Sequence, residues 1–379
     1  MTDKSINQEA MRDIVSNFRI GGRMTRAEPY GTGHINDTYA VYFEAAPQKR
    51  YIFQRINHRI FPDVPRLMEN ITRVTEHIRG KLERAPGSDR ERCTLTIIPV
   101  KSGASFLETA AGEYWRAYVF IEGASTHDVL KEKRQAFEAA KTFGAFQGLL
   151  ADLPAPPLHE TIPYFHHTPR RMSALKEAVR KDAANRCATA GNEIKFALAR
   201  EPMTSVVVDM LAKGLLPERV THNDTKINNV MIDDVSGRGV CAIDLDTVMA
   251  GSALYDFGDM VRTAAATSAE DETDLSKAGV DMTLFAELVR GYLESAGSFL
   301  NDAERNNLAF SARLITFTIG IRFLTDFLAG DVYFKTHRPN HNLDRARVQF
   351  RMVEMMEARE EEMRRIVQKQ EKINHGFHG

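Results

Sequence analysis

One short stretch near the middle of the chain brings together side chains that suit phosphoryl transfer. It reads Val220-Thr-His222-Asn-Asp224-Thr-Lys-Ile-Asn-Asn229-Val-Met-Ile, with an aspartate two residues after a histidine and an asparagine five residues after the aspartate. Phosphoryl transfer from a nucleotide needs a carboxylate that receives the proton of the attacking hydroxyl, and oxygen ligands that hold Mg²⁺ on the phosphates. Asp224 suits the first task and Asn229 the second.

A second carboxylate follows this loop. The run Gly239-Val-Cys-Ala-Ile-Asp244 is typical of a short strand, and Asp244 ends it 15 residues beyond Asn229. A hard oxygen ligand at a strand end beside the loop would complete a Mg²⁺ site. Taken singly, Asp244 is also compatible with a turn, and a lone histidine such as His222 is more often a structural hydrogen-bonding group. We therefore predict that His222 has a structural role and orients the loop. The order and spacing of Asp224, Asn229 and Asp244 together favour a catalytic site.

The elements that must position these residues follow from periodicity. Residues 28–58 alternate in period two around Gly31 and Gly33, which predicts a β-hairpin and a third strand. Residues 67–82 have the apolar spacing of an amphipathic helix, and 94–100 and 114–121 predict two more strands. We expect a small domain of five strands and one helix that ends near residue 123. Helical patterns then fill most of the chain, at 131–150, 172–187, 192–199, 204–213, 281–296, 302–329 and 342–372.

Composition limits the classes of protein. A length of 379 residues is enough for two domains or one two-lobed enzyme. Fifty basic against 51 acidic side chains give a net charge of -1, which does not support binding to nucleic acid or to a charged membrane surface. The three cysteines have no CxxC spacing, so neither a disulfide framework nor a zinc site is expected. No stretch approaches 18 apolar residues. We expect a cytoplasmic protein without a membrane, nucleic-acid or obligate protein partner.

The motifs resemble the phosphotransferase branch of the protein-kinase-like fold, which includes aminoglycoside and choline kinases. Those enzymes carry a His-x-Asp-x4-Asn loop followed by an Ile-Asp strand end. The resemblance is closer still to the N-acetylhexosamine 1-kinases, and it spans about residues 28–356. It rests on Gly33-His-Ile-Asn-Asp-Thr-Tyr39, Phe53-Gln-Arg-Ile-Asn57, Met68-Glu-Asn-Ile71, Tyr114-Trp-Arg116, His222-Asn-Asp-Thr-Lys-Ile-Asn-Asn229, Ile243-Asp-Leu-Asp-Thr247, Tyr255-Asp-Phe-Gly-Asp259, Arg322-Phe-Leu-Thr-Asp326 and Gly330-Asp-Val-Tyr-Phe334.

The resemblance implies an α+β fold with two lobes. Residues 1–122 would form an N-lobe with a small antiparallel sheet, and residues 123–379 a larger, mainly helical C-lobe with the catalytic hairpin. Asp224 would be the catalytic base, with Asn229 and Asp244 as Mg²⁺ ligands and ATP as the phosphoryl donor.

The nucleotide would contact two parts of the N-lobe. The Gly31-Thr-Gly33 turn would cover the phosphates, because glycine lets backbone N–H groups approach closely. The adenine would lie against the linker around residues 118–123, which includes Phe120 and Glu122.

The chain departs from protein kinases in the third strand, where their lysine holds the α- and β-phosphates. This strand reads Tyr-Ile-Phe-Gln-Arg-Ile, so Arg55 would have to serve. Arginine is a forked donor rather than a point charge, so its phosphate contact should differ in geometry. Its expected carboxylate partner on the following helix is Glu69, with Glu76 as the second choice.

A second departure is a lookalike of the protein-kinase metal-binding triplet. Asp256-Phe-Gly258 lies 32 residues after Asp224, whereas Asp244 lies 20 residues after it and already ends the expected strand. We therefore interpret Asp256 and Asp259 as structural support for the catalytic loop. Asp246, two residues from Asp244, is left open as a further metal ligand.

The acceptor is expected to be a sugar. By the resemblance, Arg322 and Tyr333 lie in the sugar pocket, and His34 near the glycine turn joins them. The alternative for Arg322 is an ion pair with Asp326, four residues further along one helix. The expected reaction is ATP-dependent phosphorylation of the anomeric hydroxyl of N-acetylglucosamine or N-acetylgalactosamine.

Two alternatives stay open for the function. One is a kinase of another small alcohol, of the aminoglycoside, choline, homoserine or methylthioribose type. An acidic pocket would favour such a cationic acceptor, and Arg322 in the pocket would disfavour it. The other is a nucleotide-binding regulator without activity, which the missing third-strand lysine alone supports.

Overall fold

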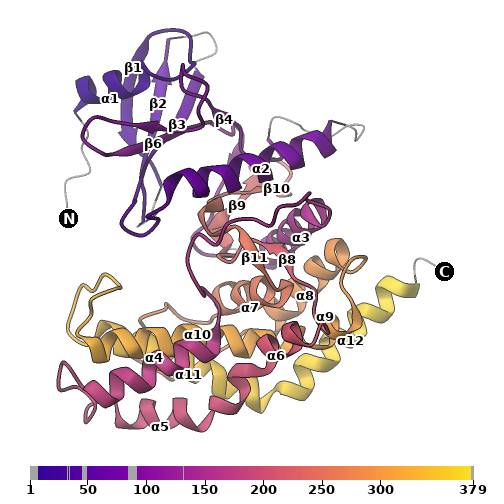
Figure 1. Ribbon diagram of the computed structural model, residues 1–379. Coiled ribbons are helices and arrows are strands. Elements are labelled where there is room, and N and C mark those ends of the chain that lie inside the picture. Colours follow the sequence, from indigo (N-terminus) through magenta and orange to yellow (C-terminus); the bar gives the residue numbers. More distant parts are fainter. Residues whose placement is uncertain are drawn as a thin grey trace. The chain divides into compact units, whose positions relative to one another are not determined.

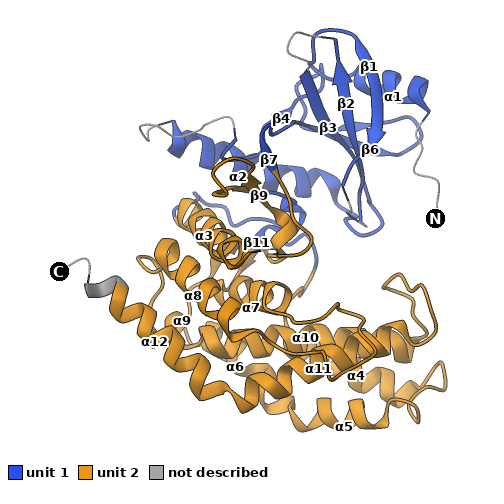
Figure 2. Cartoon of the chain, turned by 180° about the vertical axis from the view of Figure 1, so that it is seen from behind, with its two compact units in different colours: residues 1–124, 152–162, 243–249 blue, residues 125–151, 163–242, 250–379 orange. Residues whose placement is uncertain are grey.

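The computed structural model describes residues 7–31, 33, 35–44, 49–83, 92–130 and 132–376, with side chains as far as residue 373. The chain divides into two compact units (Figure 2). Unit 1 consists of residues 1–124, 152–162 and 243–249, and unit 2 of residues 125–151, 163–242 and 250–379. Two short segments that lie far from the N-terminus in the sequence thus belong to unit 1, and one of them carries Asp244.

Unit 1 is built on an antiparallel sheet (Figure 1). Its strands run in the order β1-β2-β3-β6-β4, with β5 paired to β6. They are β1 (Met24–Pro29), β2 (Asp37–Phe43), β3 (Lys49–Ile56), β4 (Ile97–Ile98), β5 (Leu107–Glu108) and β6 (Tyr114–Val119). The hairpin, the third strand and the strand from residue 114 are confirmed. The strand predicted at 94–100 is wrong in length, and β5 was not expected, because strands of two residues are too short to show alternation.

Two helices flank this sheet on opposite faces. Helix α2 (Val64–Leu82) is the predicted amphipathic helix. Helix α1 (Gln8–Val15) was not expected, since it has only eight residues and buries only Met11 and Val15. Alternate residues of a strand face opposite sides of a sheet. Phe53 and Trp115 therefore pack in the α1 core, whereas their neighbours Gln54 and Arg116 face α2.

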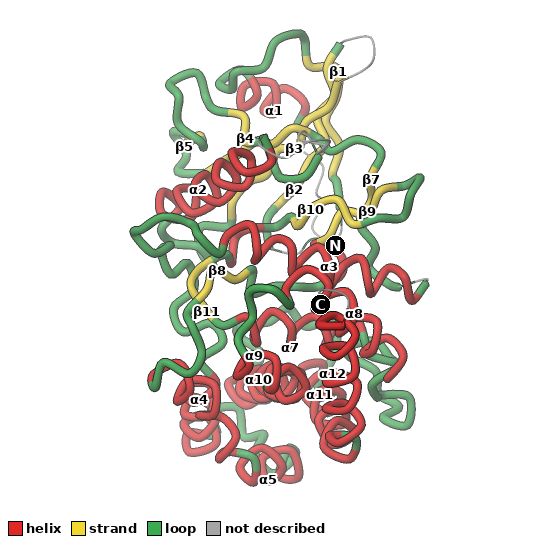
Figure 3. The backbone as a smooth tube through the Cα atoms, turned by 90° about the vertical axis from the view of Figure 1, so that its right-hand side faces the viewer, coloured by secondary structure: helices red, strands yellow, loops and turns green. Residues whose placement is uncertain are grey.

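Unit 2 is mainly helical (Figure 3). Its helices are α3 (Lys133–Leu150), α4 (Thr168–Lys181), α5 (Gly191–Ala199), α6 (Val206–Ala212), α7 (Ala253–Ala264), α8 (Met282–Ala296), α9 (Asp302–Asn306), α10 (Leu308–Ala329), α11 (His341–Ala358) and α12 (Glu360–Gly376). The periodicity missed α7 and merged α9 with α10 and α11 with α12. Short strands complete the fold: β7 (Ala124–Ser125), β8 (Arg219–Thr221), β9 (Val230–Asp233), β10 (Gly239–Ala242) and β11 (Met249–Gly251).

Helix α10 forms the centre of unit 2 and packs against α4, α7 and α11. It is long and apolar enough to cross a membrane, with a mean hydropathy of 1.4 over its most apolar 18 residues. It lies within the helix predicted at residues 302–329, and it holds a longer apolar stretch than the sequence analysis found. Because 78% of that stretch is buried within the protein, α10 has the burial of a core helix. Its close approach to α7 requires Gly258, where a Cβ atom would collide with the carbonyl oxygen of Ser311.

Candidate active site

The loop between β8 and β9 presents Asp224, and a buried carboxylate from α7 holds that loop. Asp256 accepts hydrogen bonds from the backbone N–H groups of His222 (2.8 Å) and Asn223 (2.7 Å). Gln147 donates to the same carboxylate at 2.6 Å. Asn223 has a φ of 64°, a left-handed conformation that asparagine tolerates better than most residues. The prediction that Asp256 supports the loop is confirmed. Since its Asp-Phe-Gly triplet lies within a helix, it is a lookalike only.

His222 orients the loop from within the core, as predicted. Its ring lies edge-on against Phe143 (5.2 Å between centroids) and Phe146 (5.7 Å) from α3. Its Nδ1 atom accepts a hydrogen bond of 3.3 Å from the backbone N–H of Asp224. The imidazole therefore fixes the backbone that carries the predicted base, and does not itself reach outward, because it is fully buried.

The Asp224 carboxylate has two partners from its own loop. Lys226 Nζ lies 2.9 Å from Oδ1, and Asn229 Nδ2 donates to Oδ2 at 3.1 Å and to the backbone carbonyl at 2.8 Å. Burial alone would raise the pKa of Asp224, but the positive charges near it, Lys226 first among them, together lower it. Asp224 in turn raises the pKa of Lys226. Asp224 is thus held ionised, as a general base must be. Sequence analysis did not single out Lys226.

Asp259 lies one turn further along α7, and its side-chain contact is with Arg262 of the same helix rather than, as predicted, with the catalytic loop. Its Oδ1 atom accepts a hydrogen bond of 2.9 Å from Arg262 Nε, and both side chains are buried. The Arg262 guanidinium also pairs with Glu270 at 2.9 Å. Arg262 therefore links α7 to the segment that follows it.

The two predicted metal ligands belong to different units. Asn229 lies in unit 2, where its amide nitrogen donates to Asp224, so its amide oxygen would be the atom that binds the metal. Asp244 lies in unit 1 with an exposed carboxylate and a φ of 59°, directly before the 3-10 turn Leu245–Thr247. Both supply hard oxygen donors, which fit Mg²⁺. Among the described residues, no cluster of three His, Cys, Asp or Glu side chains forms a metal site by itself.

Asp246, which the sequence left open, is bound by protein donors at both carboxylate oxygens. Arg116 Nη1 donates to Oδ1 at 2.5 Å and Asn36 Nδ2 donates to Oδ2 at 2.6 Å. Burial acts to lower the pKa of Arg116, but Asp246 more than offsets it and the pKa is raised. Arg116 also donates to Gln54 at 2.9 Å, and Asn36 accepts from the backbone of Asn57 at 3.0 Å. This network ties the residues just after the glycine turn and the sheet to the segment that carries Asp244.

The predicted pairing of Arg55 with Glu69 is wrong. Arg55 donates to Asp37 at 2.6 Å and to Glu113 at 2.7 Å, and Glu69 instead lies 2.9 Å from His159. The reason is strand parity, because Arg55 lies on the α1 side of the sheet and Glu69 belongs to α2. The cation that faces α2 is Arg116, from β6. Its only sequence signal was its place in the Tyr114-Trp-Arg116 motif.

The predicted nucleotide-binding segments of unit 1 lie beside each other. Tyr30, directly before Gly31, packs edge-on against Phe120 of the linker at 5.4 Å. The Arg50 guanidinium lies 3.6 Å from the centroid of the Phe120 ring and pairs with Glu122 at 2.6 Å.

The backbone of the glycine turn is only partly described. Gly31 has a φ of 75°, which favours glycine, and Gly33 is described as well. His34, the predicted sugar ligand of this turn, lies outside the described residues.

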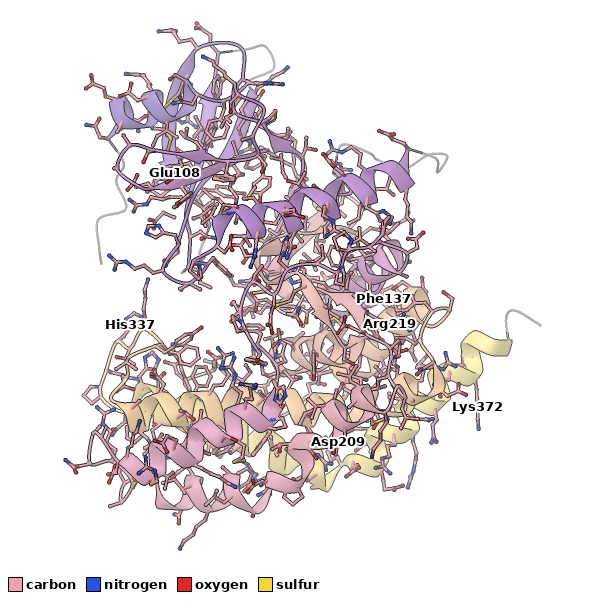
Figure 4. All side chains as sticks on the ribbon, viewed as in Figure 1. Glu108, Phe137, Asp209, Arg219, His337 and Lys372 are labelled. Carbon is pink, nitrogen blue, oxygen red and sulfur yellow. The ribbon has the colours of Figure 1, made fainter. Side chains whose placement is uncertain are left out.

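The structure brings Arg322 and Tyr333 together. The Arg322 guanidinium lies 5.7 Å from the ring of Tyr333, 5.5 Å from that of Phe334 and 5.2 Å from that of Phe165. The alternative ion pair with Asp326 is wrong, since Asp326 accepts the backbone N–H groups of residues 332–334 at 2.8–2.9 Å. It thereby shapes the start of the loop between α10 and α11, on which Figure 4 labels His337.

The comparisons with known proteins agree with this geometry. Residues 26–298, well over half of the chain, match the phosphotransferase enzyme family. The chain belongs to this family. The matched residues of this phosphotransferase include the loop of Asp224 and both predicted metal ligands, Asn229 and Asp244.

Solved structures show the same fold at low sequence identity. An aminoglycoside phosphotransferase from Alicyclobacillus acidocaldarius is 11% identical, with a TM-score of 0.58 over 96% of this chain and 97% of that one. A choline kinase from Cryptosporidium parvum is 14% identical, with a TM-score of 0.57 over 95% and 98%. The amicoumacin kinase hAmiN, in complex with AMP-PNP, Ca²⁺ and Ami, is 14% identical, with a TM-score of 0.55 over 92% and 94%. The phosphotransferase thus has the protein-kinase-like α+β fold that its motifs predicted.

Proposed function

We propose that this phosphotransferase transfers the γ-phosphoryl group of ATP to the anomeric hydroxyl of N-acetylglucosamine or N-acetylgalactosamine. The observation that best supports this reaction is the Asp224 carboxylate. It is held ionised by Lys226 and accepts a hydrogen bond from Asn229 of the same loop. The amicoumacin kinase with AMP-PNP and Ca²⁺ supports a nucleotide donor and a divalent cation.

Asp224 provides the general base of this reaction. As the acceptor hydroxyl attacks the γ-phosphorus, its proton passes to an Asp224 carboxylate oxygen, the new P–O bond forms, and the bond to the β-phosphate oxygen breaks to leave ADP. An anomeric hydroxyl is more acidic than an ordinary alcohol, so a single aspartate suffices. Mg²⁺ held by Asn229 and Asp244 would neutralise charge that develops on the phosphate oxygens.

The region around Arg322 supports a sugar as the acceptor. A sugar site needs directional donors beside an apolar or aromatic surface. Arg322 supplies donors, and the rings of Phe165, Tyr333 and Phe334 lie around it. A kinase of another small alcohol is the second candidate, favoured by the aminoglycoside and choline kinases of the same fold. A cationic acceptor of that kind would meet the unneutralised Arg322.

The test compares Asp224→Asn with the wild type and with Asp234→Asn. Asp234 is an exposed residue of the turn between β9 and β10, so it receives the same chemical change outside the loop. We expect Asp224→Asn to lower kcat by about 10²–10⁴-fold, the usual contribution of a general base, and to leave ATP affinity unchanged. Asp234→Asn should behave as the wild type.

Product analysis decides the acceptor. ADP release is measured with N-acetylglucosamine, N-acetylgalactosamine, galactose, kanamycin, choline and homoserine, and NMR locates the phosphate on the sugar. Phosphate on C1 of an N-acetylhexosamine supports the proposal. If only a non-sugar alcohol is turned over, the proposed mechanism stands, but the acceptor is that alcohol and not a sugar. Normal turnover in Asp224→Asn overturns the base.

A further inference from the structure

Two arginines of unit 2 meet at one aromatic residue beside the predicted acceptor site. Arg171 of α4 donates to the Phe165 carbonyl from Nε (3.3 Å) and from Nη2 (3.1 Å). Arg322 of α10 faces the ring of the same Phe165 at 5.2 Å. Arg322 also lies 5.7 Å from the ring of Tyr333, and the positive charge of Arg171 acts on Arg322. The two guanidinium groups thus share one small region, although 151 residues separate them in the sequence.

Neither guanidinium has a carboxylate partner within the part of the chain that the structure describes. No Asp or Glu oxygen lies within 4.0 Å of either group there, and Asp326, the nearest in sequence to Arg322, is used on backbone N–H groups. Burial first, and then the positive charge of Arg171, lower the pKa of Arg322 to about 10. Neighbouring, partly buried cations without an anion are unfavourable, so a ligand rich in oxygen acceptors would relieve them.

A buried histidine next to them supplies the opposite kind of group. His166 Nε2 lies 2.9 Å from the backbone carbonyl of Asn223, which can only accept, so Nε2 carries the proton. Nδ1 is therefore an acceptor, and it is buried without a hydrogen-bond partner. Burial lowers the pKa of His166 to about 4, so the ring stays neutral. A buried acceptor without a partner is rare, and a hydroxyl donor from a ligand would satisfy it.

This cluster lies one residue from the predicted base. Asn223, whose carbonyl His166 holds, directly precedes Asp224. An acceptor whose reacting hydroxyl is at Asp224 would therefore place another part of itself against this cluster. Sequence analysis pointed to Arg322 alone, and gave no signal for Arg171 or His166.

We propose that Arg171, Arg322 and His166 form the subsite for the non-reacting part of the acceptor, and that it selects a sugar that carries an amide carbonyl or carboxylate oxygen besides its hydroxyl groups. The two guanidinium groups bind that oxygen, and His166 Nδ1 accepts from a hydroxyl group. The same subsite rejects an ammonium group by charge repulsion. The inference rests on the proposed function, since it takes the acceptor to be a sugar.

The experiment measures binding of four sugars without nucleotide. Glucose, glucosamine and N-acetylglucosamine differ only at C2, and glucuronate adds a carboxylate. Titration calorimetry or ligand-observed NMR is applied to the wild type, Arg171→Ala, Arg171→Lys and Arg170→Ala. Arg170 is the matched control, because it is an exposed arginine of the same helix that lies over Tyr164 at 3.4 Å. A thermal melt shows that each variant is folded.

We expect the wild type to bind N-acetylglucosamine or glucuronate more tightly than glucose, and glucosamine least. Arg171→Ala should lower the affinity for the preferred sugar by about 10- to 100-fold, which is the effect of losing one charge-assisted hydrogen bond. The same substitution should lower the affinity for glucose far less. Arg171→Lys should recover only part of the affinity for the preferred sugar. Arg170→Ala should match the wild type. Whether the amide or the carboxylate sugar binds more tightly identifies the source of the oxygen.

The outcomes separate this inference from the proposed reaction. Equal binding by Arg171→Ala and the wild type, a wild-type preference for glucosamine, or no sugar binding at all overturns the subsite. Sugar binding that is lost in Arg171→Ala, without ADP release or a C1-phosphate from the wild type, supports the subsite and removes the proposed reaction. If N-acetylglucosamine is turned over equally well by the wild type and by Arg171→Ala, the proposed reaction is supported and the subsite is overturned.

Discussion

Arg116 in unit 1 and Arg322 in unit 2 are both desolvated arginines, and they differ in what faces them. Arg116 points at the Asp246 carboxylate, which it contacts at 2.5 Å. Arg322 faces three aromatic rings and a second arginine. The pKa of Arg116 is raised because Asp246 outweighs burial, whereas burial lowers that of Arg322 to about 10.

The contrast separates a structural cation from one that is ready for a ligand. Asp246 accepts from Arg116 and Asn36 at its two oxygens, so this pair is complete within the protein. Nothing among the described residues neutralises Arg322 in the same way. A buried cation with its anion present contributes to the fold, while one without an anion gains its partner only when a ligand binds.

The largest effect is expected from Arg116→Met, which leaves Asp246 buried without its cation. Breaking a buried ion pair from one side typically lowers the free energy of unfolding by about 3–5 kcal/mol. Denaturant unfolding followed by circular dichroism measures this loss. Arg50→Met is the matched control, because it removes an exposed pair with Glu122 that is worth about 1 kcal/mol or less.

A second substitution sharpens this result. Adding Asp246→Asn to Arg116→Met removes the unpaired charge, so part of the lost stability should return. If Arg116→Met is no less stable than Arg50→Met, the Arg116–Asp246 pair does not hold unit 1 together and the contrast with Arg322 fails.

The opposite behaviour is expected from Arg322→Met. This change removes the repulsion between Arg322 and Arg171 along with a few cation–ring contacts, so the free energy of unfolding should change by less than about 1 kcal/mol. The KM for the acceptor should rise by about tenfold or more, with the KM for ATP unchanged, because the group acts on the ligand. A loss of stability as large as that of Arg116→Met would show that Arg322 is structural.

The sequence predicted the parts of the site that lie on one continuous segment. The spacing of Asp224 and Asn229 pointed to the loop, and this loop is held by His222 and Asp256 as expected. Local spacing carries this information because a short loop fixes its own residues relative to one another. The antiparallel sheet and α2 were equally readable from their periods.

Pairings between distant segments could not be predicted in this way. The pairing of Arg55 with Glu69 was expected because Glu69 lies on the helix that follows the third strand, but a shift of one residue along a strand moves a side chain to the other face. Arg116 and Asp246 lie 130 residues apart, and Arg171 and Arg322 lie 151 apart. Their partners depend on how strands and helices pack, which spacing along the chain does not encode.

Lys226 is intermediate between Arg116 and Arg322. It is paired with a carboxylate, as Arg116 is, but its side chain is half-exposed. It is the cation that lowers the pKa of Asp224 against the effect of burial. As the proposed base, Asp224 can accept a proton only when it is ionised, so we expect wild-type activity to be retained down to a pH below the usual carboxylate range. Lys226→Met removes the strongest opposition to burial, raises the pKa of Asp224 and moves the acidic limb of kcat/KM to higher pH.

Rates of ADP release between pH 4 and 8 measure this limb, and Lys226→Arg, which keeps the charge, should leave it in place. The same pairing contributes stability at neutral pH that is lost as the pH falls through the lowered pKa of Asp224, so Lys226→Met should also flatten the fall in melting temperature on acidification. An acidic limb that Lys226→Met does not move would show that the ion pair present in the free protein opens once substrates bind. Lys226 would then belong with Arg322, as a cation whose final partner is a ligand.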